Sequence, residues 1–170
     1  MEKKNDYYSP NYLSVSKLLQ HERFSRDVWD CACGDGVVSE VLKLHGYSVT
    51  STDSEWHGYG LDVDFMKYAS QYNGDIVTVP PYNKTFEFVK RAYELITDGH
   101  KVAALLPLHF LGGKKRYKFL SENPPQTVYI LIKRPVYTKA DGESQVQAAT
   151  PCAWFVWQKG SICAPIIRWI

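Results

Sequence analysis

The stretch that most constrains the fold is Asp75-Ile-Val-Thr-Val-Pro-Pro-Tyr82. Its run of β-branched residues predicts a buried strand. Pro80 and Pro81 must end that strand, because a proline has no N–H group to donate to a sheet ladder. The chain therefore turns there, and Tyr82 is held just beyond the carboxyl end of the strand. In open α/β sheets, ligands bind at this end of the strands.

Segments with strand character alternate with segments of helical periodicity along the chain. We predict strands at residues 27 to 31, 47 to 52, 61 to 63, 75 to 79, 101 to 106, 127 to 132 and 153 to 157. We predict helices around residues 13 to 19, 37 to 44, 86 to 96 and 114 to 120, with Ser9 or Asn11 capping the first. This alternation indicates an α/β sandwich with a mostly parallel sheet of about seven strands. The last two strands have no helix between them, so we expect an antiparallel hairpin at one edge.

Size and charge limit the organisation of the chain. With 170 residues, 45% of them hydrophobic, residues 1 to 170 fit one compact domain with a sizeable core. The 20 basic and 18 acidic residues nearly balance, so the total charge indicates no particular partner. The block from Lys101 to Lys139 nevertheless holds eight Lys or Arg and one acidic residue. This block either faces an anionic polymer or forms a solvated basic face.

The cysteines and the apolar segments argue against two classes of protein. Cys31 and Cys33 stand one residue apart in a stretch better explained as a turn, and Cys152 and Cys163 have no Cys or His at zinc-site spacing beside them. We therefore expect no metal. No segment approaches the roughly 18 apolar residues of a membrane span, and the polar N-terminus leads into no apolar run. We therefore expect a soluble cytoplasmic protein with reduced thiols.

The turn Asp30-Cys-Ala-Cys-Gly-Asp-Gly36 follows the first predicted strand and precedes a helix. Glycines at such a turn let a ligand approach the backbone. Asp53, which ends the next strand, lies where a carboxylate would accept hydrogen bonds from ribose. These features alone suit a site for NAD, a nucleotide or S-adenosylmethionine. They equally suit a tightly packed turn that binds no ligand. A dinucleotide motif would have a third glycine where Ser39 stands, and the absence of Gly-Lys-Ser/Thr excludes a P-loop.

Taken together and in order, these segments resemble a small phage-type or bacterial adenine-N6 methyltransferase over nearly the whole chain. The segments similar to the motifs of that family are Tyr8-Ser9-Pro10, Asp30 to Gly36, Asp53, Gly60 to Phe65, and Asp75 to Tyr82. The resemblance implies a Rossmann-like methyltransferase sandwich that binds S-adenosylmethionine. The cofactor contacts that it implies are Tyr8, Ser9, Pro10, Asp30, Ala32, Gly34, Gly36, Asp53 for the ribose and Asp62 for the adenine amine.

The resemblance also implies a mechanism for Val79, Pro80, Pro81 and Tyr82. In this family a side-chain oxygen at the first position and the carbonyl of the first proline accept hydrogens from the exocyclic amine. The aromatic residue stacks on a base that has left the duplex. Most relatives have Asn, Asp or Ser where this chain has Val79, which offers no acceptor. We therefore expect cofactor binding with weak or absent methyl transfer.

Nucleic acid is the partner that the resemblance implies, with DNA preferred. Candidate phosphate contacts are His109, Lys114, Lys115 and Arg116, which follow a predicted strand end. No separate target-recognition domain is visible, so target choice would fall to loops 54 to 60 and 140 to 150 or to a second subunit. Trp154 and Trp157 either stack on bases or, as strand aromatics usually do, belong to the core. Alternatives are a non-catalytic module that binds S-adenosylmethionine or nucleic acid, and methylation of RNA or of a protein Gln or Asn.

Overall fold

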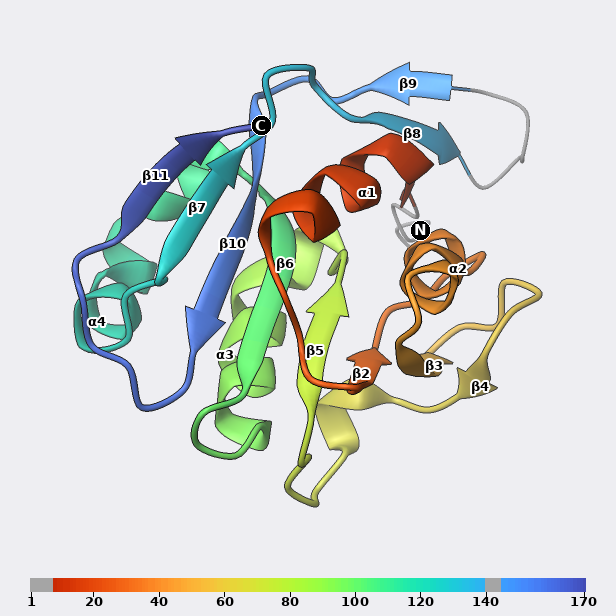
Figure 1. The fold of residues 1–170 in the computed structure, drawn as a ribbon, viewed down its shortest axis with the longest axis horizontal. Coiled ribbons are helices and arrows are strands. Elements are labelled where there is room, and N and C mark those ends of the chain that lie inside the picture. Colours follow the sequence, from red (N-terminus) through yellow and green to blue (C-terminus); the bar gives the residue numbers. More distant parts are fainter. Residues whose placement is uncertain (1–7, 140–144) are drawn as a thin grey trace, which may run out of the picture.

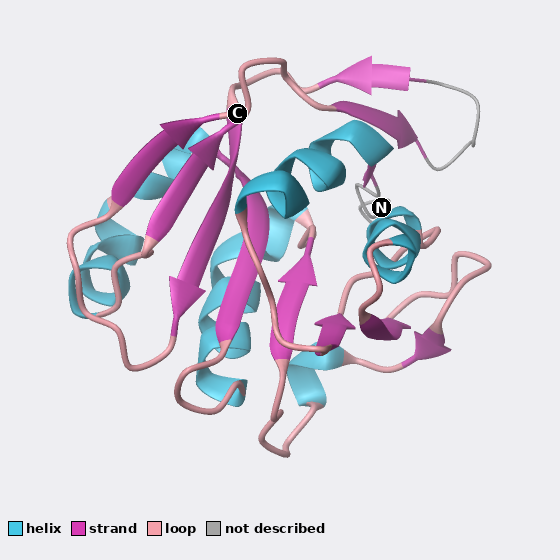
Figure 2. Cartoon of the chain, in the orientation of Figure 1, coloured by secondary structure: helices cyan, strands magenta, loops and turns pink. Residues whose placement is uncertain are grey.

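The computed structural model describes residues 8 to 139 and 145 to 170. Its helices are α1 (Tyr12–His21), α2 (Val37–Leu44), α3 (Thr85–Leu95) and α4 (Lys114–Glu122), and its 3-10 turns are η1 (Phe65–Lys67), η2 (Tyr82–Lys84) and η3 (Leu108–Leu111). The main sheet has the strand order β11 (Ile166–Trp169), β7 (Thr127–Ile130), β10 (Cys152–Gln158), β6 (Lys101–Pro107), β5 (Asp75–Thr78), β2 (Asp27–Asp30), β3 (Ser48–Asp53) and β4 (Leu61–Asp62). A small second sheet has the order β1 (Tyr8–Pro10), β8 (Val136–Lys139) and β9 (Gln145–Gln147). Figures 1 and 2 show these elements.

The main sheet is mostly parallel, as predicted. Among its eight described strands only β10 is antiparallel to its neighbours β6 and β7. The antiparallel pairing of the two late strands is therefore confirmed, but its expected place at the edge is wrong. Strand β11 forms that edge, parallel to β7, and the sequence analysis missed it. Ile166 and Ile167 are each about half exposed, so this short strand lacks the buried apolar face that its prediction would have needed.

Helices cover both faces of the sheet (Figure 1). Helices α1 and α2 pack on one face and α3 and α4 on the other, in two separate core clusters. Strand β6 serves both clusters by alternation, with Ala103 and Leu105 on one side and Val102 and Ala104 on the other. The result is the three-layer α/β sandwich that the alternating pattern predicts.

Two polar contacts explain local features of the sandwich. The side chain of Asn11 caps α1 by accepting a hydrogen bond from the Ser14 amide at 3.0 Å, so the predicted cap is confirmed for Asn11. Trp154 and Trp157 are fully buried on β10 and donate their indole N–H groups to the carbonyls of Ser14 and Asn123. Both tryptophans are therefore core residues, and neither is available to stack on a base.

The small sheet joins the start of the chain to a segment far from it in sequence. Strand β1 pairs antiparallel with β8, with Ser9 opposite Thr138. Strand β9 then pairs with β8, so residues 145 to 147 of the loop predicted at 140 to 150 belong to this sheet. Residues 140 to 144 of that loop lie outside the described residues.

The described helices and cysteines bear on membrane spans and metal sites. The helices within residues 8 to 139 and 145 to 170 are all too short or too polar to cross a membrane. The four cysteines carry free thiols, three of them buried and Cys163 exposed. Within the described part of the chain, no group of three or more His, Cys, Asp or Glu residues is arranged to hold a metal ion.

Candidate functional site

A pocket of about 150 Å³ opens at the carboxyl ends of β2, β3 and β5. We call it the main pocket. It is lined by Pro10, Cys31, Ala32, Cys33, Gly34, Val37, Val38, Asp53, Ser54, Glu55, His57, Asp64, Phe65, Met66, Val79, Pro80, Pro81, Tyr82, Asn83, Lys84 and Phe88. The glycine turn, the acidic end of β3 and the Pro-Pro segment, which the sequence analysis singled out separately, thus meet in one place.

The segment from Val79 to Tyr82 forms one wall of the main pocket. The Pro81 carbonyl accepts hydrogen bonds from the Lys84 amide and from the Thr85 hydroxyl, both at 3.1 Å. These bonds fix the turn η2 directly after the prolines. Val79 and Tyr82 are half-buried and pack against the core cluster of α1 and α2, so their side chains lie between the core and the pocket.

Tyr137 of β8 positions Tyr82. The two rings lie edge to face with their centroids 6.1 Å apart. Tyr137 is buried, and burial, followed by the nearby Tyr82 and Cys152 side chains, raises its pKa far above the usual value of a tyrosine. Its phenol therefore stays neutral and acts as a fixed support. The sequence held no signal for this contact, because it depends on how the small sheet folds over the main one.

Asp53 connects the glycine turn to the main pocket. One of its carboxylate oxygens accepts a hydrogen bond from the Gly34 amide at 2.9 Å, and the other accepts one from the Glu55 amide at 3.1 Å. The Cys33 amide donates to the Thr52 carbonyl at 3.0 Å. The carboxylate is thus held at the pocket wall, and each oxygen keeps a lone pair for a further donor.

Gly36 has a structural reason to be glycine. Its φ of +91° lies in the left-handed region, and a Cβ atom there would come within 2.6 Å of the Tyr59 ring. The Tyr59 hydroxyl donates a hydrogen bond to the Glu40 carboxylate and accepts one from the Lys43 ammonium at 2.6 Å. These two bonds hold the ring in place. Gly36 does not line the main pocket. It lets Tyr59 fix the loop after β3 onto α2.

Replacing Gly36 by alanine is expected to lower the free energy of unfolding by about 3 kcal/mol, since it adds left-handed strain to an overpacked contact. Removing the Tyr59 ring in the same chain should relieve the contact but leave the strain. Urea unfolding of Gly36→Ala, Tyr59→Ala and the double variant measures the two parts. If the losses of unfolding free energy in the two single variants add up to the loss in the double variant, the Tyr59 ring is not the reason why position 36 requires glycine.

Asp30 is placed differently from what the resemblance implies. Its side chain is fully buried and accepts hydrogen bonds from the hydroxyls of Ser39 at 2.8 Å and Thr78 at 3.0 Å. Burial raises the pKa of Asp30 to about 7. The residue does not line the main pocket. It ties β2 to α2 and to the end of β5, directly before Val79.

The other implied cofactor residues are divided between the pocket and its surroundings. Pro10, Ala32 and Gly34 line the main pocket, whereas Asp62 is exposed on β4 and does not. Asp64, two residues later, does line it. The nearby Lys67 ammonium lowers the pKa of Asp64, which keeps this carboxylate charged. The backbone of Tyr8 and Ser9 belongs to β1, and the side chains of these two residues lie outside the described part of the chain.

The four implied nucleic-acid contacts lie outside the main pocket. His109, Lys114 and Lys115 are exposed around η3 and the start of α4. Arg116 donates from its Nε atom to the carbonyls of Phe110 and Gly112, each at 2.9 Å. Its guanidinium therefore closes the turn between η3 and α4, which leaves it poorly placed to bind phosphate.

The two thiols of the pocket wall, Cys31 and Cys33, are unreactive. Burial, followed by the negative charges of Asp30 and Asp53, raises the pKa of Cys33 to about 12. Burial likewise raises the pKa of Cys31 well above its usual value. Both thiols therefore stay protonated, and neither can act as a nucleophile at neutral pH.

Several residues of the pocket escaped the sequence analysis as site residues. They are Glu55, His57, Asp64, Phe65, Met66, Lys84 and Phe88. Asp64 had a usable signal, because it stands two residues after Asp62 in the same short segment and caps the turn η1 by accepting a hydrogen bond from the Met66 amide at 3.0 Å. The others come from loops and from a helix whose approach to the pocket depends on the whole fold.

Comparison with known proteins now places the fold. No protein-family model matches the chain, and no curated protein matches it. Solved structures do resemble it. A proposed class I S-adenosylmethionine-dependent methyltransferase from Listeria monocytogenes has a TM-score of 0.62 and 14% identity, covering 94% of this chain and 62% of that one. A predicted O-methyltransferase from Agrobacterium tumefaciens has a TM-score of 0.66 and 12% identity, covering 94% of this chain and 85% of that one.

A third similar structure is a proposed RNA methyltransferase from Pyrococcus horikoshii, with a TM-score of 0.57 and 14% identity over 87% of this chain and 81% of that one. At such identities the likeness concerns the fold. The chain has the Rossmann-like fold of class I S-adenosylmethionine-dependent methyltransferases, and the predicted fold class is confirmed. The names of these neighbours describe different substrates, so their likeness indicates no particular substrate for this chain.

Proposed function

We infer that the protein binds S-adenosylmethionine in the main pocket and belongs functionally to the amino-methyltransferases. One observation carries this inference: the glycine turn, Asp53 and the segment Val79 to Tyr82 line the same pocket. Each alone suits several functions. Their meeting at the carboxyl edge of a parallel sheet suits a cofactor with a ribose beside a planar substrate.

The residues present fit the cofactor. The Asp53 carboxylate is held where it can accept hydrogen bonds from ribose hydroxyls, and the backbone at Gly34 leaves room for close approach. Asp64 is better placed than Asp62 to bind an adenine amine, because it lines the pocket and is kept charged by Lys67. Phe65 and Met66 offer apolar surface for a purine. When bound, the cofactor would supply an electrophilic methyl group.

The substrate that the pocket fits best is the exocyclic amine of adenine in nucleic acid, with DNA preferred. Tyr82 offers a ring at the pocket wall, supported by Tyr137, on which a flipped base can stack. The Pro80 carbonyl is one acceptor for the amine hydrogens. Val79 supplies no second acceptor, so the expected methyl transfer is weak. The same residue supports the second candidate, a non-catalytic module that binds the cofactor and nucleic acid.

Replacing Asp53 by asparagine is expected to weaken S-adenosylmethionine binding about tenfold, because a neutral amide oxygen accepts a ribose hydroxyl less strongly than a carboxylate does. Titration calorimetry measures the dissociation constant. Asp35→Asn, an exposed change in the same turn, is the matched control and should bind as the unchanged chain does. An unchanged chain that releases no heat with S-adenosylmethionine would refute the proposed function.

The substrate class is tested by incubation with labelled S-adenosylmethionine and, in parallel, unmethylated DNA, RNA and protein. Identification of the modified group then separates the candidates. Label on adenine N6 supports the proposal, label on a Gln or Asn amide supports a protein substrate, and cofactor binding without transfer supports the non-catalytic module. A second subunit that selects the target sequence stays a prediction.

A further inference from the structure

A second hollow lies beside the main pocket. Its volume is about 650 Å³. We call it the basic groove. It is lined by Asn11, Leu13, Ser14, Lys17, Leu131, Ile132, Lys133, Arg134, Val136, Gln147 and Ile170. The groove therefore runs between α1 and the connection from β7 to β8.

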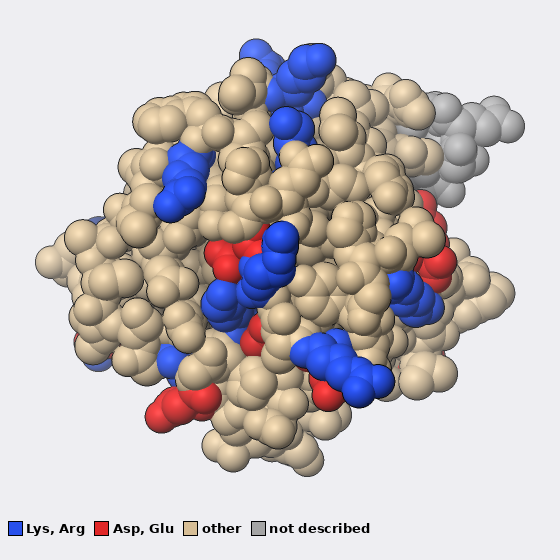
Figure 3. Space-filling model, in the orientation of Figure 1, with Lys and Arg blue, Asp and Glu red and all other residues tan. Residues whose placement is uncertain are grey.

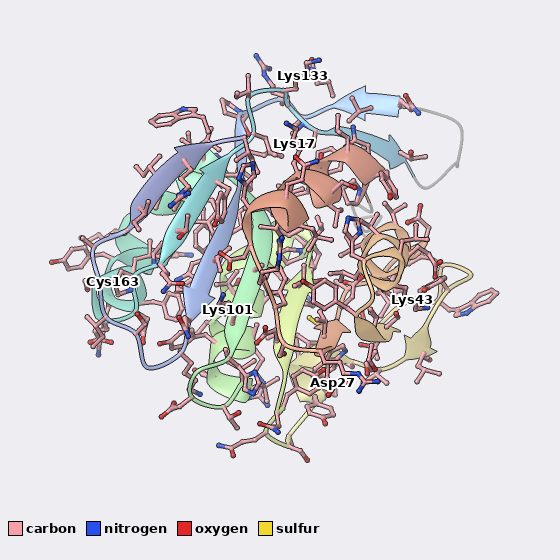
Figure 4. The ribbon with its side chains drawn as sticks, in the orientation of Figure 1. Lys17, Asp27, Lys43, Lys101, Lys133 and Cys163 are labelled. Carbon is pink, nitrogen blue, oxygen red and sulfur yellow. The ribbon has the colours of Figure 1, made fainter. Side chains whose placement is uncertain are left out.

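Among the described residues, the charged side chains that line the groove are all basic. Lys17, Lys133 and Arg134 line it, and no Asp or Glu does. None of these three cations takes part in an ion pair with any residue of the described ranges. Arg134 donates one N–H to the Ala149 carbonyl at 3.2 Å, which orients the guanidinium and leaves its other donors for a ligand. Figure 4 shows Lys17 and Lys133 near each other at the top of the view. In the same orientation, Figure 3 shows basic side chains and no acidic ones at the top of the molecule.

Apolar and amide groups accompany the charges. Leu13 is 52% exposed and Ile132 is 72% exposed, both in the groove wall. Asn11 and Gln147 add hydrogen-bonding side chains. A ligand that fits has negative charges at intervals and flat apolar surfaces between them. A nucleic-acid strand has both, as phosphates and base faces.

The basic groove adjoins the main pocket at two pairs of residues that are neighbours in sequence. Pro10 lines the main pocket and Asn11 lines the groove. On β8, Val136 lines the groove while Tyr137 supports Tyr82 in the main pocket. The paired strands β1 and β8 thus form the wall between the two hollows. A nucleic-acid strand whose base enters the main pocket would therefore pass over β1 and β8 to reach the groove.

We propose that the basic groove binds the phosphates of a single nucleic-acid strand beside the base held at Tyr82. This proposal rests on the proposed function for the base in the main pocket, and on the groove itself for the strand. It replaces the region around Lys114 and Lys115 as the principal phosphate contact. An anionic lipid surface is the other partner that these cations could meet, and binding to phospholipid vesicles tests it against the oligonucleotide.

The test is the salt dependence of binding to a single-stranded oligonucleotide of roughly 12 nucleotides. The triple variant Lys17→Gln, Lys133→Gln, Arg134→Gln removes three phosphate contacts, so the slope of log affinity against log salt should fall by about 2. At low salt we expect a loss of affinity of roughly 10- to 100-fold. The single variant Lys133→Gln, an exposed change, should lower the slope by about 0.7 and guards against misfolding of the triple variant.

The matched control is Lys114→Gln, Lys115→Gln, Lys118→Gln, which removes the same charge from the exposed side of α4. Its slope should stay near that of the unchanged chain. The proposal is overturned if the groove variants keep the original slope, or if the control lowers it as much. It is equally overturned if the unchanged chain binds vesicles of anionic phospholipid through the groove cations but does not bind the oligonucleotide.

Calorimetry with S-adenosylmethionine separates this proposal from the proposed function. The groove variants should bind the cofactor as the unchanged chain does, because none of the three cations lines the main pocket. A chain that binds the oligonucleotide through the groove but never binds S-adenosylmethionine would refute the proposed function and leave the groove proposal standing. If the unchanged chain binds S-adenosylmethionine but the groove variants keep the original salt slope, the groove proposal is refuted and the proposed function stands.

Discussion

Replacing Val79 by asparagine is expected to raise methyl transfer to adenine-containing DNA by about 10²–10³. Val79 stands half-buried in the wall of the main pocket, next to the Pro80 carbonyl and before Tyr82. An asparagine there would place an amide oxygen beside a bound amine, so that two acceptors instead of one would draw its hydrogens. A preorganised acceptor of this kind lowers the barrier without any strong base. Initial rates with labelled S-adenosylmethionine measure the gain.

Two further variants show whether the gain comes from the new acceptor. Val79→Ile keeps the position apolar and should leave the rate unchanged. Tyr82→Ala in the Val79→Asn chain removes the stacking ring and should lower the rate again while cofactor binding persists. A folded Val79→Asn chain that binds S-adenosylmethionine but methylates no DNA, RNA or protein would contradict our explanation and favour the non-catalytic module.

Local patterns were sufficient for the parts of the fold that depend on local chemistry. The prolines after β5 end that strand wherever the sheet lies, and the glycines after β2 allow the left-handed backbone that a tight turn needs. The meeting of Gly34 and Asp53 also follows, because the carboxyl ends of adjacent parallel strands share one edge. These residues formed the predicted core of the site, and the structure brings them together.

Contacts between distant segments were not predictable in this way. The support of Tyr82 by Tyr137 depends on the small sheet, whose strands have only three or four residues each. The edge strand β11 has no buried face, so its sequence lacks the apolar pattern from which a strand is predicted. Asp64 lines the pocket and Asp62 does not, because the chain leaves β4 and enters η1 between them, and periodicity does not predict where so short a strand ends.

The basic block from Lys101 to Lys139 illustrates the same limit for charge. A linear count treats all its cations alike. In the structure Lys101 pairs with Glu22 at 2.7 Å, Arg116 closes a turn, and Lys133 and Arg134 join Lys17 in the basic groove. Only the fold separates the cations that serve structure from those that are open to a ligand.

The stability of the protein is expected to fall by about 4 kcal/mol between pH 4 and pH 8 because of Asp30. Burial raises the pKa of this carboxyl from 3.8 to about 7. Between those values the folded chain keeps a proton that the unfolded chain has lost, so stability decreases as pH rises. The contribution is fully present below about pH 4 and is lost as pH passes through about 7.

The variant Asp30→Asn isolates this effect, because an amide does not titrate and can still bond the hydroxyls of Ser39 and Thr78. We expect its free energy of unfolding in urea, relative to that of the unchanged chain, to rise by about 4 kcal/mol from pH 4 to pH 8. Asp27→Asn, at the exposed start of the same strand, should leave the pH dependence as it was. If Asp30→Asn follows the unchanged chain at every pH, the Asp30 carboxyl titrates normally and is not the buried tie between α2 and the Pro-Pro segment. The wall that carries Val79 would then owe its position to packing alone.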